Sequence, residues 1–135
     1  MNIEYKKKNY LQVKSEFEFY KELEKAVTQD IIIAPQVHLE RIIEMHREPH
    51  GAFCRNYFYH GISELSFDFV LFNRSFKPLL AIELDGKSHE DKKRKERDAF
   101  VEEICKQADL KLLRWDREDA YDSEKLRKAI QDKLN

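Results

Sequence analysis

The sequence is poor in residues that break regular structure or cross-link a chain. It has three glycines, three prolines and two cysteines among 135 residues, beside nine Phe and six Tyr. This composition excludes a low-complexity or disordered chain, because such chains lack the aromatic side chains that build a core. Cys54 and Cys105 lie far apart in unlike contexts, which argues against a disulfide framework. We expect one domain over 1–135, with 1–13 as a flexible arm.

The sequence also lacks a net charge and a long apolar run. Its 25 basic and 26 acidic residues sum to −1, so the total indicates neither a nucleic-acid nor a membrane partner. No apolar run approaches the ~20 residues of a membrane helix, and the first ten residues lack the apolar stretch of a signal peptide. With reduced thiols, these features favour a cytoplasmic protein without a membrane partner.

Hydrophobic periodicity predicts an α/β fold in the order α-β-α-β-β-α-β-α. Ser15 and Glu18 have the spacing of a capping box at the first helix. Both hairpin strands are apolar on both faces, so we expect a mixed four-stranded sheet with helices on its two sides. We expect Ala99, Phe100, Ile104 and Ala108 to face inward on the long helix. The expected ranges are helix 15–27, strand 31–37, a short helix 39–43, strands 67–72 and 79–84, helix 92–108, strand 110–115 and helix 123–134.

Three acidic residues interrupt the apolar hairpin. If it closes about Ser75 and Phe76, paired residue numbers sum to 151 and Asp68 stands opposite Glu83, with Cβ atoms ~5 Å apart. Asp85 shares their face if the strand is still extended there. Like charges at this distance repel by about 4 kcal/mol at an effective dielectric of ~20, so a cation or protons must offset them.

A hard divalent cation is the natural partner of such acids. Mg²⁺ or Mn²⁺ takes carboxylate and carbonyl oxygens and can accept a phosphate. Two alternatives remain open. The acids could be solvated or paired with Arg97 or Arg114, and a register slip of one residue would put Asp68 and Glu83 on opposite faces.

A basic run follows the acids. Six basic residues stand against three acidic ones between Lys87 and Arg97, which leaves +3. Lysine and arginine contacts to phosphates give sequence-independent affinity for nucleic acids. A solvated helix face is the simpler explanation of the same run. The candidate phosphate contacts are Lys92, Lys93, Lys95 and Arg97.

A second set of metal ligands lies between the strands. His46, His50, Cys54 and His60 carry the nitrogen and sulfur donors that zinc prefers. Their spacing matches no compact zinc module, so we do not expect structural zinc.

Several of these segments together resemble a known family. The segments Phe67-Asp68-Phe69-Val70-Leu71, Ala81-Ile82-Glu83-Leu84-Asp85-Gly86 with His89, Glu96-Arg97-Asp98-Ala99-Phe100 and Leu112-Leu113-Arg114 are similar to an uncharacterised bacterial domain family. That family belongs to the restriction-endonuclease-like, PD-(D/E)XK, superfamily, near the very-short-patch-repair endonucleases. The resemblance covers 15–115 and implies a core in the order α, β, β, β, α, β.

The resemblance also implies residue roles. Asp68 and Glu83 would be metal ligands together with the Leu84 carbonyl, and Glu16 would reach the metal through water. Asp85 stands where many superfamily nucleases carry a catalytic lysine, which is a departure from the pattern. The general base is then His89, Lys87 or a water on the metal.

The function implied is that of a Mg²⁺- or Mn²⁺-dependent DNA endonuclease. The alternative is a catalytically silent module that keeps the fold and binds nucleic acid or protein. A homodimer is compatible with a double-strand cut, which needs two active sites. Neither the shape nor the sequence of the DNA substrate follows from the residues.

Overall fold

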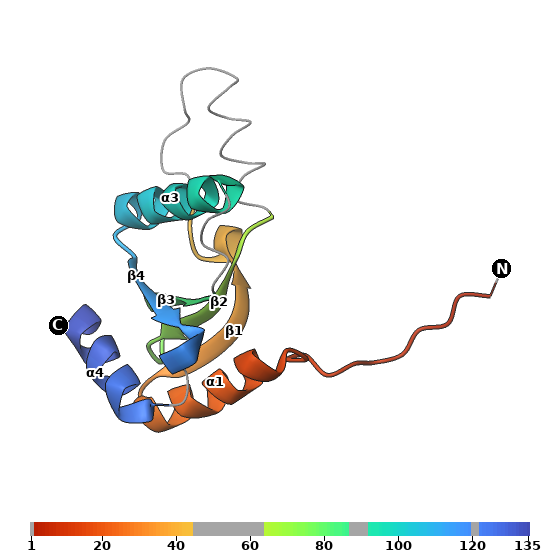
Figure 1. Ribbon diagram of the computed structural model, residues 1–135, viewed down its shortest axis with the longest axis horizontal. Helices are drawn as coiled ribbons and strands as arrows, with labels where there is room; N and C mark the ends of the chain where they lie inside the picture. The colour runs from red at the N-terminus through yellow and green to blue at the C-terminus, as the bar shows by residue number, and fades with distance from the viewer. Residues whose placement is uncertain (1, 45–63, 87–91, 120–121) are drawn as a thin grey trace, which may run out of the picture.

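The computed structural model describes residues 2–44, 64–86, 92–119 and 122–135 of the chain. In this part the protein is an α/β fold with a mixed four-stranded sheet and three α-helices (Figure 1). The elements are α1 (Lys14–Ala26), β1 (Ile32–His38), the 3-10 helix η1 (Leu39–Arg41), β2 (Ser66–Phe72), β3 (Pro78–Asp85), α3 (Lys92–Gln107), β4 (Lys111–Asp116), the 3-10 helix η2 (Arg117–Asp119) and α4 (Ser123–Leu134).

The sheet has the strand order β1-β2-β3-β4. β1, β2 and β3 are antiparallel neighbours, whereas β4 runs parallel to β3. α3 lies between β3 and β4 in the sequence, which confirms the predicted parallel crossover, because parallel neighbours cannot be joined by a tight turn. The mixed sheet and its flanking helices therefore follow the predicted fold class.

The β2–β3 hairpin has the register that the sequence predicts. Phe69 pairs with Ile82, Val70 with Ala81 and Leu71 with Leu80, so the paired numbers sum to 151. The pairing shifts between Leu71 and Phe72. The turn itself is held by Asn73, whose side-chain oxygen accepts hydrogen bonds from two backbone N–H groups of the turn.

The sheet separates two apolar cores. On one face α1 and α4 pack against β2, β3 and β4, with Phe19, Leu23 and Leu126 fully buried. On the other face α3 contributes Val101 and Ile104. Figure 1 shows α3 on one side of the sheet and α1 and α4 on the other. Apolar residues on both faces of β2 and β3 are thus explained by cover on both sides.

Some local predictions were wrong. Ala99 and Ala108 are exposed, and the inward positions of α3 are Val101, Ile104 and Cys105. Alanine favours a helix without needing burial, so its position did not mark the buried face. Ser15 does not cap α1: the cap residue is Val13, and no side chain caps it.

The short helix expected over 39–43 is only the 3-10 helix Leu39–Arg41. The segment 2–13 has no regular secondary structure and extends away from the sheet (Figure 1). No helix in the described part of the chain is long and apolar enough to cross a membrane.

Candidate functional site

The carboxyl groups of Asp68 and Glu83 lie in contact at one end of the β2–β3 hairpin. Phe69 and Ile82 form the last pair of this end of the ladder, and Asp68 and Glu83 are the next residues on the two strands. Their side chains are close enough for a hydrogen bond with Asp68 to raise the pKa of Glu83. A hydrogen bond between two carboxyl groups requires a proton on one of them. The sequence prediction that Asp68 stands opposite Glu83 therefore agrees with the geometry.

Asp68 is also tied to the backbone of β3. The Leu84 N–H donates a hydrogen bond of 2.8 Å to Asp68 Oδ2. Cross-strand pairing of β2 with β3 is recorded as far as Phe69 and Ile82, so this side chain bonds the β3 backbone just beyond the ladder. The orientation of the Asp68 carboxylate is therefore fixed by the sheet.

The surroundings of Glu83 favour its neutral form. Burial, then the hydrogen bond from Asp68 and the Asp68 charge, raise the pKa of Glu83 from 4.5 to about 8. Arg97 and Arg114 act in the opposite direction but do not offset these effects. The neutral form of Glu83 is consequently favoured at neutral pH.

Glu16 joins this acidic neighbourhood from the first turn of α1. Burial, followed by the Asp68 charge, raises its pKa, while Arg117 and a hydrogen bond from Gln36 lower it. The Gln36 Nε2 group donates to Glu16 Oε2 at 3.1 Å. Gln36 has a φ of 54°, a backbone conformation rare outside glycine.

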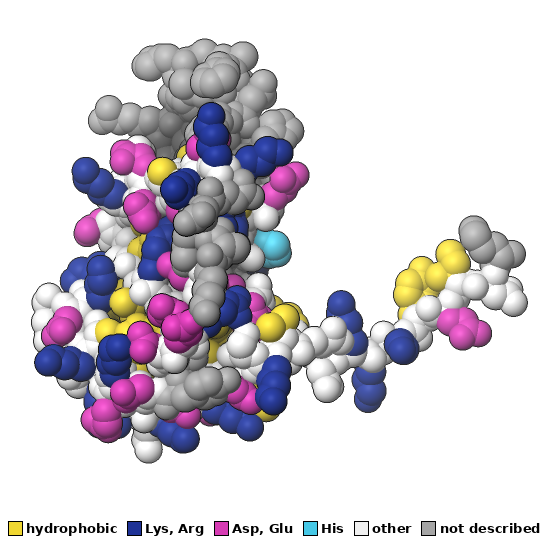
Figure 2. Space-filling model, in the orientation of Figure 1, with side chains coloured by type: hydrophobic (Ala, Val, Ile, Leu, Met, Phe, Trp, Pro, Cys, Tyr) yellow, Lys and Arg dark blue, Asp and Glu magenta, His cyan; other side chains and the backbone are white. Residues whose placement is uncertain are grey.

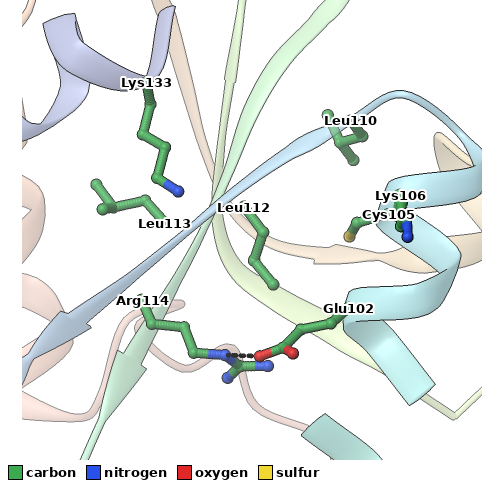
Figure 3. A pocket seen from close by; sticks show the side chains of 8 residues that line it. All are labelled: Glu102, Cys105, Lys106, Leu110, Leu112, Leu113, Arg114 and Lys133. Carbon is green, nitrogen blue, oxygen red and sulfur yellow. Dashed lines mark hydrogen bonds and ion pairs between the residues drawn. The ribbon is translucent and has the colours of Figure 1, made fainter. Parts of the chain in front are cut away.

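Asp85 belongs to a different arrangement. Its carboxylate is 3.5 Å from Arg114 Nη1, which also lies 3.5 Å from Asp98 Oδ1. Arg114 Nε donates to Glu102 at 3.0 Å (Figure 3). The structure therefore brings Asp68 and Glu83 together but pairs Asp85 with an arginine. Asp98 also pairs with Arg114.

The predicted phosphate contacts lie at the start of α3. Lys92, Lys93 and Lys95 are exposed in its first turn, and Arg97 is exposed one turn further on. The Arg97 charge acts on Glu83, as noted above. Figure 2 shows Lys and Arg side chains on the outer surface of the α3 region.

Gln36 and Arg117 were missed by the sequence reasoning. Gln36 follows Pro35 in an apolar strand, and Arg117 follows β4 in a run of mixed charge. Arg117 donates to the Ser15 hydroxyl, so it links the residue after β4 to the start of α1. Both act through contacts between distant elements, and no local sequence pattern marks such contacts.

Two predicted catalytic residues, Lys87 and His89, lie outside the described residues. The same is true of the set His46, His50, Cys54 and His60. Among the described residues, no group of three or more His, Cys, Asp or Glu side chains is placed to hold a metal ion.

A groove of about 530 Å³ is lined in part by Arg114. Leu112, Leu113 and Cys105 form part of its wall between α3 and β4 (Figure 3). Burial, and then the charge of Glu83, raise the pKa of the Cys105 thiol to about 11. The thiol is therefore protonated at neutral pH, which does not suit a nucleophile. The remaining residues that line the groove are Glu102, Lys106, Leu110, Arg114 and Lys133.

The donor set at the acid pair fits a hard divalent cation. Its oxygens come from Asp68 and Glu83, with Glu16 nearby, and Mg²⁺ and Mn²⁺ take oxygen ligands. Burial first, and then Asp68, raise the pKa of Glu83, so its charged form needs a positive partner. A bound cation would replace the proton that the two carboxyl groups now share.

A protein-family model matches residues 8–134, and its description is "Protein of unknown function (DUF2726)". The chain belongs to the DUF2726 family. This match agrees with the expected uncharacterised domain family, but it carries no link to the restriction-endonuclease-like superfamily. No curated protein and no solved structure matches the chain.

Proposed function

We propose that this DUF2726 chain is a metal-dependent nuclease that hydrolyses DNA phosphodiester bonds at the Asp68–Glu83 pair. The observation that carries the proposal is the contact between two carboxyl groups in which Glu83 has a pKa of about 8. Titratable groups with strongly shifted pKa values are enriched at functional sites. The proposal includes Mg²⁺ or Mn²⁺ as the cofactor.

The topology supports this proposal. The order α1, β1, β2, β3, α3, β4 is the order of the restriction-endonuclease-like core, and α4 follows it. The acid pair lies on the central strands β2 and β3, one acid on each. We infer that the fold is of this type and that η1 and the residues after it are an insertion before the hairpin.

The start of α3 supplies a second line of support. A helix N-terminus carries a partial positive charge, so cations in the first turn are unfavourable there. The first turn of α3 nevertheless has Lys92, Lys93 and Lys95 and no acidic residue. An anionic ligand such as the DNA backbone would relieve this repulsion.

The residues have distinct roles in this proposal. Asp68 and Glu83, with the Leu84 carbonyl, hold the cation, and Glu16 acts through water. A bound Mg²⁺ or Mn²⁺ supplies charge neutralisation at the phosphate and a lower pKa for the attacking water. Lys92, Lys93, Lys95 and Arg97 hold the backbone. Lys87 or His89 is proposed as the general base. Asp85, fixed by Arg114, takes a positioning role.

Nicking of supercoiled plasmid in Mn²⁺ tests the proposal. We expect the wild type to nick the plasmid and Glu83→Gln to lose at least 100-fold of the rate, because the variant cannot supply the second negative charge. Glu103→Gln is the matched control: it makes the same change on an exposed residue of α3 and should keep wild-type activity. Equal nicking by wild type and Glu83→Gln would contradict the assignment of this site.

A second function is favoured by one observation. Asp85 stands at the position where superfamily nucleases carry lysine, and Arg114 holds it in an ion pair at 3.5 Å. A catalytically silent module that binds nucleic acid or protein would keep such a pair. Absence of cleavage by the wild type on plasmid, branched and single-stranded DNA in Mn²⁺ would favour this function.

A further inference from the structure

A basic segment precedes α1 and has no role in the proposed site. Lys6, Lys7 and Lys8 are consecutive, and Tyr5 and Tyr10 flank them. All five are exposed, Tyr5 by 91%. The three lysines form no ion pair or hydrogen bond with any residue that the structure describes, and Figure 2 shows Lys side chains standing out from this segment. Their charge is therefore available to a ligand.

Tyr10 ties this segment to the backbone of β1. Its hydroxyl donates to the carbonyl oxygens of Pro35 and Gln36, at 3.2 and 3.4 Å. The Gln36 side chain in turn bonds Glu16, whose pKa the Asp68 charge raises. The basic segment is thus attached two hydrogen bonds away from Glu16, the outer acid of the proposed site.

The two basic elements belong to opposite faces of the sheet. α3 covers one face, whereas the segment 2–13 leads into α1, which covers the other. Lys6 and Lys8 lie four and two residues before Tyr10, so an extended chain puts them within roughly 7–14 Å of the anchor. The advance of ~3.3 Å per residue is close to the ~3.4 Å rise per nucleotide along the DNA helix axis.

We propose that residues 5–10 form a second phosphate-binding element that holds duplex DNA against the acid pair. This inference rests on the proposed function for its substrate class. The three lysines contact the DNA backbone without reading its sequence, since ammonium groups carry no base-specific pattern. Together with the start of α3, the segment encloses the duplex from both faces of the sheet.

Fluorescence anisotropy with a labelled DNA duplex in EDTA tests this element without cleavage. The variant is the triple change Lys6→Gln, Lys7→Gln and Lys8→Gln. The matched control is Lys106→Gln, Lys111→Gln and Lys133→Gln, three lysines on or near β4 that have no ion pair within the described structure. Both proteins lose three positive charges, so a difference between them reports position rather than total charge.

We expect the segment variant to bind the duplex at least tenfold more weakly near 0.1 M salt, and the control to stay within twofold of wild type. The slope of log K against log salt should fall by about 2.7 in the segment variant, from three phosphate contacts at about 0.9 each. Equal affinities and slopes for the two triple variants would overturn the inference. Stronger binding to phosphatidylserine vesicles than to duplex, lost in the segment variant, would also overturn it.

The same experiment separates this inference from the nuclease proposal. If the wild type cleaves no DNA but only the segment variant loses affinity and slope, the segment binds nucleic acid and the nuclease proposal fails. If Glu83→Gln abolishes nicking while the segment variant binds and nicks like wild type, the segment inference fails alone.

Discussion

Glu83 and Asp85 are two residues apart on the same strand, yet their carboxyl groups have neighbours of opposite charge. Glu83 faces another acid, and among the described residues neither it nor Asp68 has an ion pair. Asp85 faces Arg114, which also lies within 3.5 Å of Asp98 and 3.0 Å of Glu102. In the described part of the chain, the first group, the Asp68–Glu83 pair, forms no ion pair with a basic side chain, although Arg97 and Arg114 act on Glu83 from a distance. The second group, the Arg114 cluster, contains the guanidinium group of Arg114 as its cation.

The difference shows how carboxylates that stabilise the fold can be distinguished from carboxylates that need a ligand. Carboxylates around an arginine are stabilised in their charged form, so they favour the fold at neutral pH. Two carboxyl groups in contact oppose each other's ionisation and favour the fold only with a proton or a cation between them. The Arg114 cluster is therefore balanced by its own arginine, and the Asp68–Glu83 pair is the one that the proposed function assigns to a metal ion.

The first expected effect is stabilisation by Mn²⁺, which should depend on the Asp68–Glu83 pair and not on the Arg114 cluster. At a Mn²⁺ concentration of about 100 times Kd, the wild type should gain about 2.7 kcal/mol of unfolding free energy. Glu83→Gln and Asp68→Asn should lose this gain, and Asp85→Asn should keep it. Chemical denaturation with and without Mn²⁺ measures each value. Equal Mn²⁺ stabilisation of wild type and Glu83→Gln would remove the distinction.

The next effect is the loss of stability when the Arg114 cluster is broken by substitution. Arg114→Met should destabilise the protein by about 2 kcal/mol, because Asp85 and Asp98 keep their charges in a partly buried place without their partner. Arg127→Met removes the exposed pair with Glu124 and should cost less than about 0.5 kcal/mol. Urea denaturation at pH 7 compares the two. A smaller effect at Arg114 than at Arg127 would show that the cluster is not structural.

A third effect is the pH dependence of the metal-free protein. Glu83 has a pKa of about 8 in the folded state and an ordinary value of 4.5, so the folded state binds the extra proton between these values. The Glu83 contribution to stability is thus full below about pH 4.5 and is lost as the pH rises to about 8.

The matching variant isolates this contribution. Glu83→Gln has no proton to lose, so its unfolding free energy should rise relative to wild type between pH 5 and pH 9 in EDTA. Asp85→Asn is the control, and its difference from wild type should show no such rise. A constant difference between Glu83→Gln and wild type over this range would contradict the raised pKa.

The sheet could be predicted because the two hairpin strands are adjacent in the sequence and are both apolar. Apolar runs on both sides of one turn fix the register of Phe69 with Ile82, and that register brings Asp68 to Glu83. Both faces of the two strands are apolar, which predicted cover by helices on each side. The two carboxylates could be found from the sequence because they interrupt these runs.

The Arg114 cluster could not be predicted in the same way. Arg114 pairs with Glu83 across the parallel β3–β4 register, and the sixteen residues of α3 separate those strands. No turn fixes a parallel register, so the sequence named Arg114 as a possible partner but did not identify its three carboxylates. Gln36 was missed for a related reason, since its positive φ turns a strand residue toward Glu16.

The hydrogen bond from the Leu84 N–H to Asp68 Oδ2 has a consequence for chemistry. A free carboxylate rotates about its Cβ–Cγ bond and would have to be ordered each time a ligand arrives. Asp68 has already lost that freedom on folding, because rotation would break its bond to the backbone of β3. The sheet itself therefore preorganises this carboxylate. The entropy loss of orienting it occurs on folding, before any ligand binds.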